Sequence, residues 1–209
     1  MKHYIIGIFI VSCFSVTGYG QSSSLWLGAH AGADMGIILA IPPYEETITS
    51  KTGIAIGAEL DYWFSDNFGI STGLAYVQKG AQENIIGEPY SDTYRYLQLP
   101  VLLKATFGSG AVKPYLFAGP EFGVKLSATS SGKFFGKDTT VDFPDSMMRN
   151  FNIGVFLGAG VSYAIAPETL VFLEAGYDYG VTNIYTHASA SEVFTRDVRA
   201  SLGILFRIE

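Results

Sequence analysis

The sequence predicts an all-β protein: an eight-stranded antiparallel up-and-down transmembrane β-barrel with short turns at one end and long loops at the other. Composition is the first observation behind this prediction, since 48% of the 209 residues are hydrophobic, 15% are charged and the mean hydropathy is +0.27. The second is that, after the N-terminus, no apolar run approaches the roughly 18–20 residues that a membrane-spanning helix needs. The third is a repeated alternation of apolar residues with glycine and polar residues.

The N-terminal segment has the features of a secretory signal peptide. Lys2 supplies a positive charge, Ile5 to Phe14 form a short apolar core, and small or polar residues precede a cleavage site before Gln21. This segment is too short for a transmembrane anchor. We therefore expect a signal peptide over residues 1–20 and one outer-membrane β-barrel domain over residues 21–209.

The single cysteine, Cys13, lies inside this N-terminal segment. Val11-Ser12-Cys13 is a poor lipoprotein attachment motif, so we interpret Cys13 as an apolar residue of the signal core. Cleavage before Gln21 leaves a mature chain without cysteine, which excludes disulfides and thiol chemistry.

Eight segments place apolar residues at every second position, the pattern of strands with two different faces. Nearly every charge within them falls on the face that also carries the glycines. A lysine or arginine facing hydrocarbon costs about 2–4 kcal/mol, so we expect the aliphatic face to contact lipid and the charged face to line the lumen. The eight segments cover residues 25–35, 51–64, 68–79, 94–107, 114–128, 151–163, 171–180 and 197–208.

The predicted connections alternate in length, as they do in outer-membrane barrels. An even number of strands places both ends of the barrel in the periplasm, on the side of the short turns. Aromatic residues near the strand ends predict an interfacial girdle at each membrane surface. The short connections are residues 65–67, 108–112 and 165–169, and the long ones are residues 37–50, 80–93, 129–149 and 183–195.

An eight-stranded barrel is just wide enough for side chains to fill its interior. The charges on the inner face are therefore expected to pair with one another, because an unpaired buried charge is costly. We interpret this network as a structural plug, with a proton or ion path as the functional alternative. Its predicted members are Glu59, Lys104, Glu121, Glu174 and Arg199.

Several segments resemble the PorT-like outer-membrane β-barrel family of small Gram-negative proteins. The resemblance implies a barrel in the cell outer membrane, reached after export through the inner membrane, and it implies no catalytic residues. The final strand, Ser201 to Ile208, resembles the C-terminal assembly signal of outer-membrane proteins. The pieces that resemble the family are Tyr96-Leu97-Gln98-Leu99-Pro100, Leu102-Leu103-Lys104, Pro114-Tyr115-Leu116-Phe117-Ala118-Gly119-Pro120, Gly158-Ala159-Gly160-Val161, Gly176-Tyr177 and Gly180-Val181-Thr182-Asn183-Ile184.

We predict no catalytic, cofactor or metal site. The two histidines of the mature chain, His30 and His187, are far apart in sequence and have no ligand-spaced partner. A formal net charge of −6 without a basic patch argues against nucleic acid as a partner. The expected partners are outer-membrane lipid and lipopolysaccharide, with an envelope protein as a further candidate. The expected function is a structural, binding or docking role at the outer loops or the periplasmic rim.

Two alternatives remain open from the sequence. His187-Ala188-Ser189, with Glu192 nearby, resembles the His-x-Ser pairing of outer-membrane lipid A deacylases, which would make the chain a lipid-modifying hydrolase. A soluble lipocalin-like periplasmic binding barrel would instead turn the apolar rows inward.

Three outer loops combine aromatic residues with charges and could contact a partner or lipopolysaccharide, or fold over the barrel mouth. They contain the segments 42–46, 87–90 and 133–137.

Overall fold

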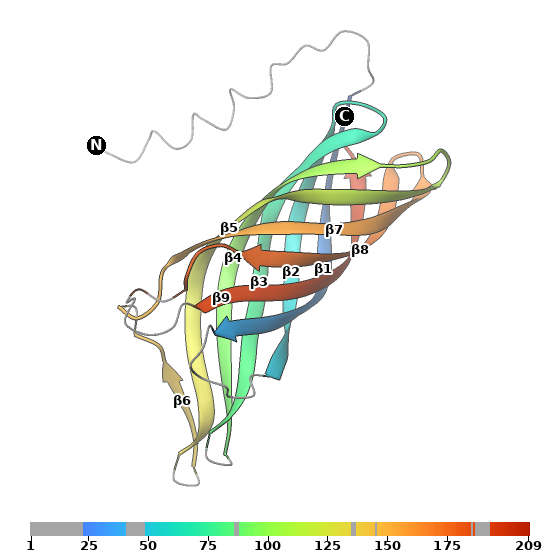
Figure 1. The fold of residues 1–209 in the computed structure, drawn as a ribbon. Coiled ribbons are helices and arrows are strands. Elements are labelled where there is room, and N and C mark those ends of the chain that lie inside the picture. The colour runs from blue at the N-terminus through green and yellow to red at the C-terminus, as the bar shows by residue number, and fades with distance from the viewer. Residues whose placement is uncertain are drawn as a thin grey trace, which may run out of the picture.

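A computed structural model describes residues 23–40, 49–85, 88–134, 137–144, 146–184, 186 and 193–209. This part of the chain contains nine strands, and every pair of neighbours is antiparallel. Eight of them, all but β6, close into a barrel (Figure 1). Each pairs with the next along the chain, with β5 followed by β7, and β9 pairs with β1. The predicted eight-stranded up-and-down barrel is confirmed. The strands are β1 (Ser24–Ala40), β2 (Thr49–Trp63), β3 (Phe68–Ile85), β4 (Glu88–Thr106), β5 (Val112–Phe134), β6 (Lys137–Asp142), β7 (Phe151–Ala166), β8 (Thr169–Gly180) and β9 (Val193–Arg207).

Among the described residues, none belongs to a helix long and apolar enough to cross a membrane.

The outer end differs from the prediction. Residues 80–93, expected as a loop, are the paired ends of β3 and β4, whose ladder continues to Ile85 opposite Glu88. Within 129–149, also expected as a loop, β5 runs on to Phe134 and pairs with the ninth strand, β6. Figure 1 shows β3, β4 and β5 reaching beyond the other strands of the barrel. These segments carry polar residues on both faces, so the apolar alternation that reveals a half-buried strand is missing from them.

The three short connections are confirmed. β2 and β3 are joined by a tight turn in which the Ser65 hydroxyl accepts a hydrogen bond from the Phe68 amide at 2.9 Å. In the turn between β4 and β5, Gly108 (φ 83°) and Gly110 (φ 120°) adopt left-handed backbone conformations that glycine accepts without a steric penalty. The Leu25 amide donates to the Glu209 carbonyl at 2.9 Å, so both ends of the barrel lie at the short-turn end.

The two faces of the barrel wall have opposite chemistry. Outward-facing aliphatic side chains are open to the surroundings, as Leu74 (52% exposed) and Leu202 (63%) illustrate. A continuous band of exposed aliphatic residues is unfavourable in water and suits hydrocarbon. The buried inward-facing set includes Asp34, Glu59, Asp61, Lys79, Lys104, Glu121, Asp178 and Arg199. The predicted sidedness is confirmed, and the lipocalin-like arrangement is excluded because the apolar rows do not pack inside.

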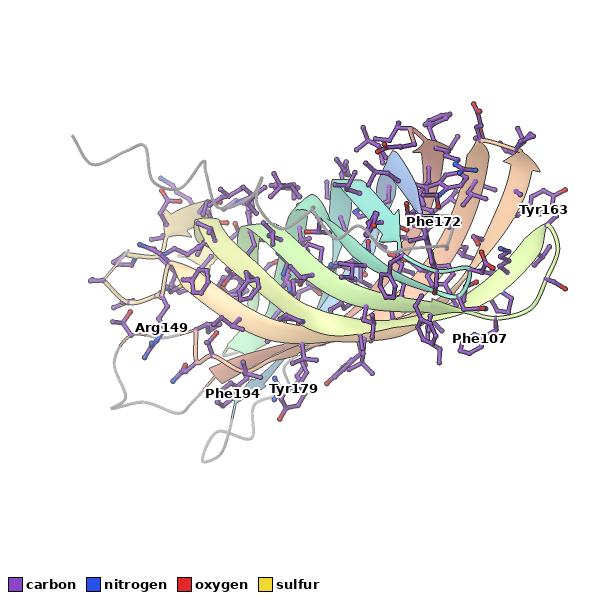
Figure 2. All side chains as sticks on the ribbon, turned by 90° about the horizontal axis from the view of Figure 1, so that it is seen from above. Phe107, Arg149, Tyr163, Phe172, Tyr179 and Phe194 are labelled. Atoms are coloured by element: carbon purple, nitrogen blue, oxygen red, sulfur yellow. The ribbon has the colours of Figure 1, made fainter. Side chains whose placement is uncertain are left out.

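Aromatic side chains stand on the outside at both ends of this band. Figure 2 shows Phe107 and Tyr163 at one end of the barrel and Tyr179 and Phe194 at the other. The exposed aromatic residues of the short-turn end are Phe64, Phe68, Phe107, Tyr163 and Phe206, and those nearer the outer end are Phe151, Tyr177 and Tyr179. Their positions agree with the predicted girdles, where ring edges meet the interface between hydrocarbon and water.

A charge placed on the outer face should destabilise the barrel in proportion to its depth. We expect Leu74→Arg, in the middle of the apolar band of β3, to lower the free energy of unfolding by about 2–4 kcal/mol. Reversible denaturant unfolding in lipid vesicles measures this change. Gln82→Arg lies on the same strand and face but beyond the band, and should change stability by about 0–1 kcal/mol. Equal effects of the two variants would contradict the assigned sidedness.

Candidate functional site

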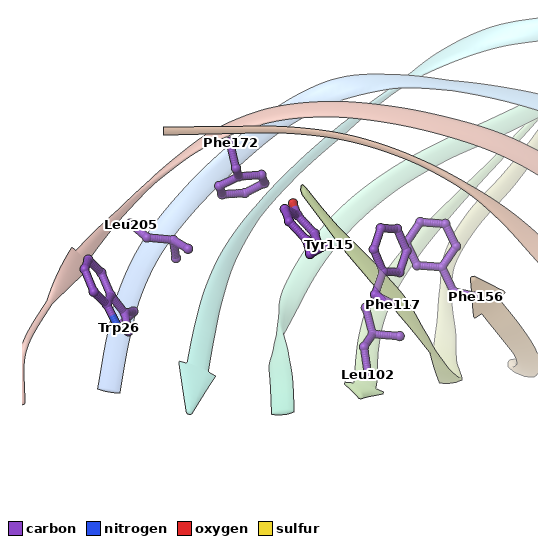
Figure 3. Packing of buried hydrophobic residues seen from close by; sticks show 7 residues of the cluster. All are labelled: Trp26, Leu102, Tyr115, Phe117, Phe156, Phe172 and Leu205. Carbon is purple, nitrogen blue, oxygen red and sulfur yellow. The ribbon is translucent and has the colours of Figure 1, made fainter. Parts of the chain in front are cut away.

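Buried side chains in the lumen form apolar and charged groups. One group, here called the aromatic layer, is aromatic and aliphatic, and its members come from six strands. Figure 3 shows them gathered inside the curve of the sheet. The Phe117 and Phe156 rings contact each other with centroids 5.1 Å apart. This layer consists of Trp26, Leu102, Tyr115, Phe117, Phe156, Phe172 and Leu205.

A first ion cluster lies against this aromatic layer and is centred on Lys104. Its ammonium group donates to Glu59 Oε1 and, at 3.0 Å, to Asp61 Oδ2. The same Nζ lies 5.3 Å from the centroid of the Tyr115 ring and 5.6 Å from that of Phe172. Two carboxylates and two ring faces therefore surround one cation, which is the kind of partnering that a buried ammonium requires.

His30 and Glu174 extend this cluster across the lumen. His30 Nδ1 lies 3.3 Å from Glu59 Oε2, and the Tyr115 hydroxyl donates to Glu174 Oε2 at 2.9 Å. His30 is paired in register with Gly57 on β2, where a Cβ atom would overlap the imidazole ring. The absence of a side chain at Gly57 thus makes room for His30.

A second ion cluster is centred on Arg199, nearer the outer end. Its guanidinium donates from Nη1 to Glu121 Oε2 at 2.9 Å, from Nε to Asp34 Oδ2 at 3.1 Å and from Nη2 to Gln98 Oε1 at 2.6 Å. Its Cζ lies 4.7 Å from the centroid of the Phe156 ring. Arginine can hold several acceptors at once because its donors are fixed in a planar fork.

Lys79 adds a third cation above Arg199. Its ammonium group donates to Asp178 Oδ2 at 2.6 Å and to Asp197 Oδ2. These side chains are almost fully buried, so the ion pairs lie within the barrel and away from its outer mouth.

A second apolar layer packs toward the outer end of the barrel. It combines tyrosines of β4 and Ala128 of β5 with residues of the segments that follow β6 and β8. Met148, only 1% exposed, belongs to this layer, and the Phe143 ring stacks on Tyr94 with centroids 6.0 Å apart. The layer consists of Tyr94, Tyr96, Ala128, Met148 and Ile184, with Phe143 packed against it.

The opposite, short-turn end, which we expect to face the periplasm, holds a pocket of about 300 Å³. Trp26, Trp63 and Leu170 provide apolar walls. Lys113 and Arg207 provide positive charge and Asp66 a negative one. Such a volume suits a small ligand or a few ordered waters. We call this cavity the periplasmic pocket.

The structure places the five residues of the predicted network in two clusters. Glu59 and Lys104 form one ion pair and Glu121 and Arg199 another, while Glu174 accepts from Tyr115. The period-two alternation also places further charged residues on the inner face, and this signal could have added them to the predicted network. They are Asp34, Asp61, Lys79 and Asp178. Additional partners, absent from the predicted network, are Asp34, Asp61, Lys79, Gln98, Asp178 and Asp197.

The hypothesis of a hydrolase depends on residues that lie outside the described part of the chain. His187, Ser189 and Glu192 belong to the segments 187–190 and 191–192, which the structure does not describe. The predicted loop segment 42–46 lies outside it as well.

Removing the central cation of the second cluster should be severely destabilising. Arg199→Met leaves the carboxylates of Glu121 and Asp34 buried without their partner, so we expect a loss of about 3–5 kcal/mol in the free energy of unfolding. Denaturant unfolding of the folded barrel checks this value. Adding Glu121→Gln should restore part of the loss, because one of the two unpaired charges is then absent. The exposed Arg207→Met is the control, with an expected change within about 0.5 kcal/mol.

Solved structures that are similar to this chain include outer-membrane proteins. The crystal structure of the outer membrane protein OprG from Pseudomonas aeruginosa matches with a TM-score of 0.52 and 14% identity, over 91% of this chain and 98% of that one. Neisserial surface protein A matches with a TM-score of 0.49 and 19% identity, over 89% and 99% of the two chains. The likeness to OprG supports the same fold. A comparison with curated protein sequences gives no match.

A family model described as "Outer membrane protein beta-barrel domain" matches residues 19–186, which is most of the chain. The match agrees with the aliphatic outer face, the charged lumen and the closed sheet, and it places the protein in the outer membrane. This chain therefore belongs to the family of outer membrane protein β-barrel domains.

Proposed function

We propose that this protein is a non-enzymatic integral outer-membrane barrel that docks a partner through the part of its sheet that stands above the membrane. This part, here called the outer extension, consists of residues 80–85 of β3, 88–95 of β4, 127–134 of β5 and 137–142, which are β6. The supporting observation is strand length, because β5 has 23 residues and is far longer than a membrane crossing requires.

A transmembrane β-strand needs only about 9–11 residues. At about 3.3 Å per residue, the 23 residues of β5 span roughly 75 Å. β5 pairs with β7 as far as Val124 and, from Thr129 onward, with β6 instead. About half of β5 is therefore unnecessary for closing or anchoring the barrel, and a rigid sheet above the membrane is a suitable platform for contact with other molecules.

The exposed edge of this platform is β6. Within the described residues it pairs with β5 alone, and all six of its residues are exposed. An edge strand presents unpaired backbone donors and acceptors to which another chain can add. Lys137, Asp138 and Asp142 place charges along this edge, which discourages indiscriminate pairing and favours a partner with complementary charges.

The filled lumen supports a role at the surface. The apolar layer toward the outer end, the two ion clusters and the aromatic layer all consist of buried side chains inside the barrel. A barrel of eight strands leaves little space once such side chains are in place. We therefore assign the ion clusters the role of a structural plug.

We further propose that the protein is a PorT-like barrel of a Gram-negative envelope. The resemblance to PorT-like barrels and the signal-like N-terminus favour a Gram-negative envelope protein exported through the inner membrane. Lipopolysaccharide surrounds the outer girdle of such a protein, so the partner of the outer extension is either this lipid or an envelope protein.

Photo-crosslinking in intact cells tests the docking role. A photoreactive residue at Val141, which is 59% exposed on β6, should yield an adduct of higher mass than the chain alone. The same residue at Asp66, in the periplasmic turn beside the periplasmic pocket, serves as the matched control and should yield none. Mass spectrometry of the adduct separates lipopolysaccharide from protein. Adducts at Asp66 but not at Val141 would move the docking site to the periplasmic rim and contradict the proposal.

A further inference from the structure

We propose that His30, Glu59 and Glu174 form a binding site for a divalent transition-metal cation inside the barrel. The three residues come from β1, β2 and β8 and face one another across the lumen at the level of the first ion cluster. Each offers one ligand atom, and these atoms lie within 4.8 Å of one another. This site is independent of the docking role proposed for the outer extension.

The spacing of the first two ligands suits a shared metal ion. His30 Nδ1 and Glu59 Oε2 are 3.3 Å apart. Two ligands at about 2.0–2.1 Å from a tetrahedral zinc ion are separated by roughly 3.3–3.4 Å. Lys104 binds the other carboxylate oxygen of Glu59, Oε1, so Oε2 is the oxygen that can bind a metal ion.

The orientation of the imidazole ring also indicates that Nδ1 is the ligand atom of His30. His30 Nε2 is buried over Gly57 and has no hydrogen-bond partner among the described side chains. The polar contact of this ring with the lumen therefore runs through Nδ1, which faces Glu59. Without a metal, an imidazole protonated at Nδ1 donates a hydrogen bond to Glu59, and a bound cation would take the place of that proton between the two groups.

With all of its carboxylates ionised, the first ion cluster carries more negative than positive charge. Glu59, Asp61 and Glu174 carry three negative charges when ionised, and Lys104 is the cationic side chain that pairs with Glu59 and Asp61 among the described residues. A neutral His30 leaves two negative charges in excess. Burying uncompensated charge is costly, so either protons or a cation must make up the difference. One divalent cation supplies the two missing positive charges.

The donor set selects the class of metal. An imidazole nitrogen with two carboxylates suits Zn²⁺ and related first-row divalent ions better than Mg²⁺ or Ca²⁺, which prefer oxygen ligands throughout. The only cysteine of the chain is Cys13, in the predicted signal peptide, so thiolate ligands play no part. Water completes the coordination of a site with three protein ligands.

The position of the site connects it with the periplasmic end. On β2, Trp63 lines the periplasmic pocket, Asp61 is the next residue inward on the same face, and Glu59 follows it. On β4, Thr106 lines the same pocket, and Lys104 is the next residue inward on the same face. Asp61 therefore lies between the periplasmic pocket and Glu59 along β2.

Metal retention by the refolded, signal-free barrel tests the site. The chain is folded into detergent with Zn²⁺ present, so that entry into a closed lumen is not limiting, and free metal is then removed by gel filtration. We expect about one Zn²⁺ per chain, and Co²⁺ bound in its place should give the visible absorption of a low-symmetry nitrogen–oxygen site. Thermal unfolding should shift to higher temperature in the presence of the metal, because the ion binds only the folded state.

Two variants and one control assign the binding to the proposed residues. His30→Ala and Glu174→Gln should each weaken Zn²⁺ binding by more than the roughly 10–100-fold that loss of an outer-shell partner costs. His187→Ala removes the other histidine of the mature chain and should bind as the parent does. The mobility of unboiled and boiled samples in electrophoresis shows that each variant is folded. Failure of the folded parent to retain Zn²⁺, or loss of the metal in His187→Ala alone, would overturn the site.

Discussion

Everything in this fold depends on the exclusion of charge from the face that meets hydrocarbon. Each strand of the barrel has only two faces, so the charges that the chain carries within the membrane must turn inward. The closed sheet satisfies the backbone hydrogen bonds without an edge inside the membrane. The outer face is then free to be aliphatic, and the lumen becomes the one place for groups such as Asp34 and Lys104.

The narrowness of the lumen explains why these charges meet in defined clusters. An interior just wide enough for side chains brings Arg199 of β9 against Glu121 of β5 and Asp34 of β1 at the same time. Glycines on the same face, such as Gly57 beside His30, leave the room that the larger polar side chains occupy. Glycines and charged residues therefore occur on the same face because the small residues leave space for the large ones in a confined volume.

Much of the fold could be predicted from the sequence, because a period of two fixes which residues share a face. The same reasoning could not predict which inward charges pair, since the pairing of Lys79 with Asp178 depends on the stagger between strands far apart in the chain. For that reason His30 showed no ligand-spaced partner in the sequence, although the fold brings it to Glu59 and Glu174. The outer extension was missed because residues 80–93 and 129–142 are polar on both faces and give no apolar period.

Fluorescence quenching by brominated lipid tests the sidedness most directly. Both tryptophans of the chain, Trp26 and Trp63, line the periplasmic pocket inside the barrel, so bromines on the acyl chains should quench the emission of the reconstituted protein only weakly. A Leu74→Trp variant, with both native tryptophans replaced by phenylalanine, should be quenched strongly because residue 74 faces hydrocarbon. Strong quenching of Trp26 and Trp63 together with weak quenching at residue 74 would show that the faces are reversed.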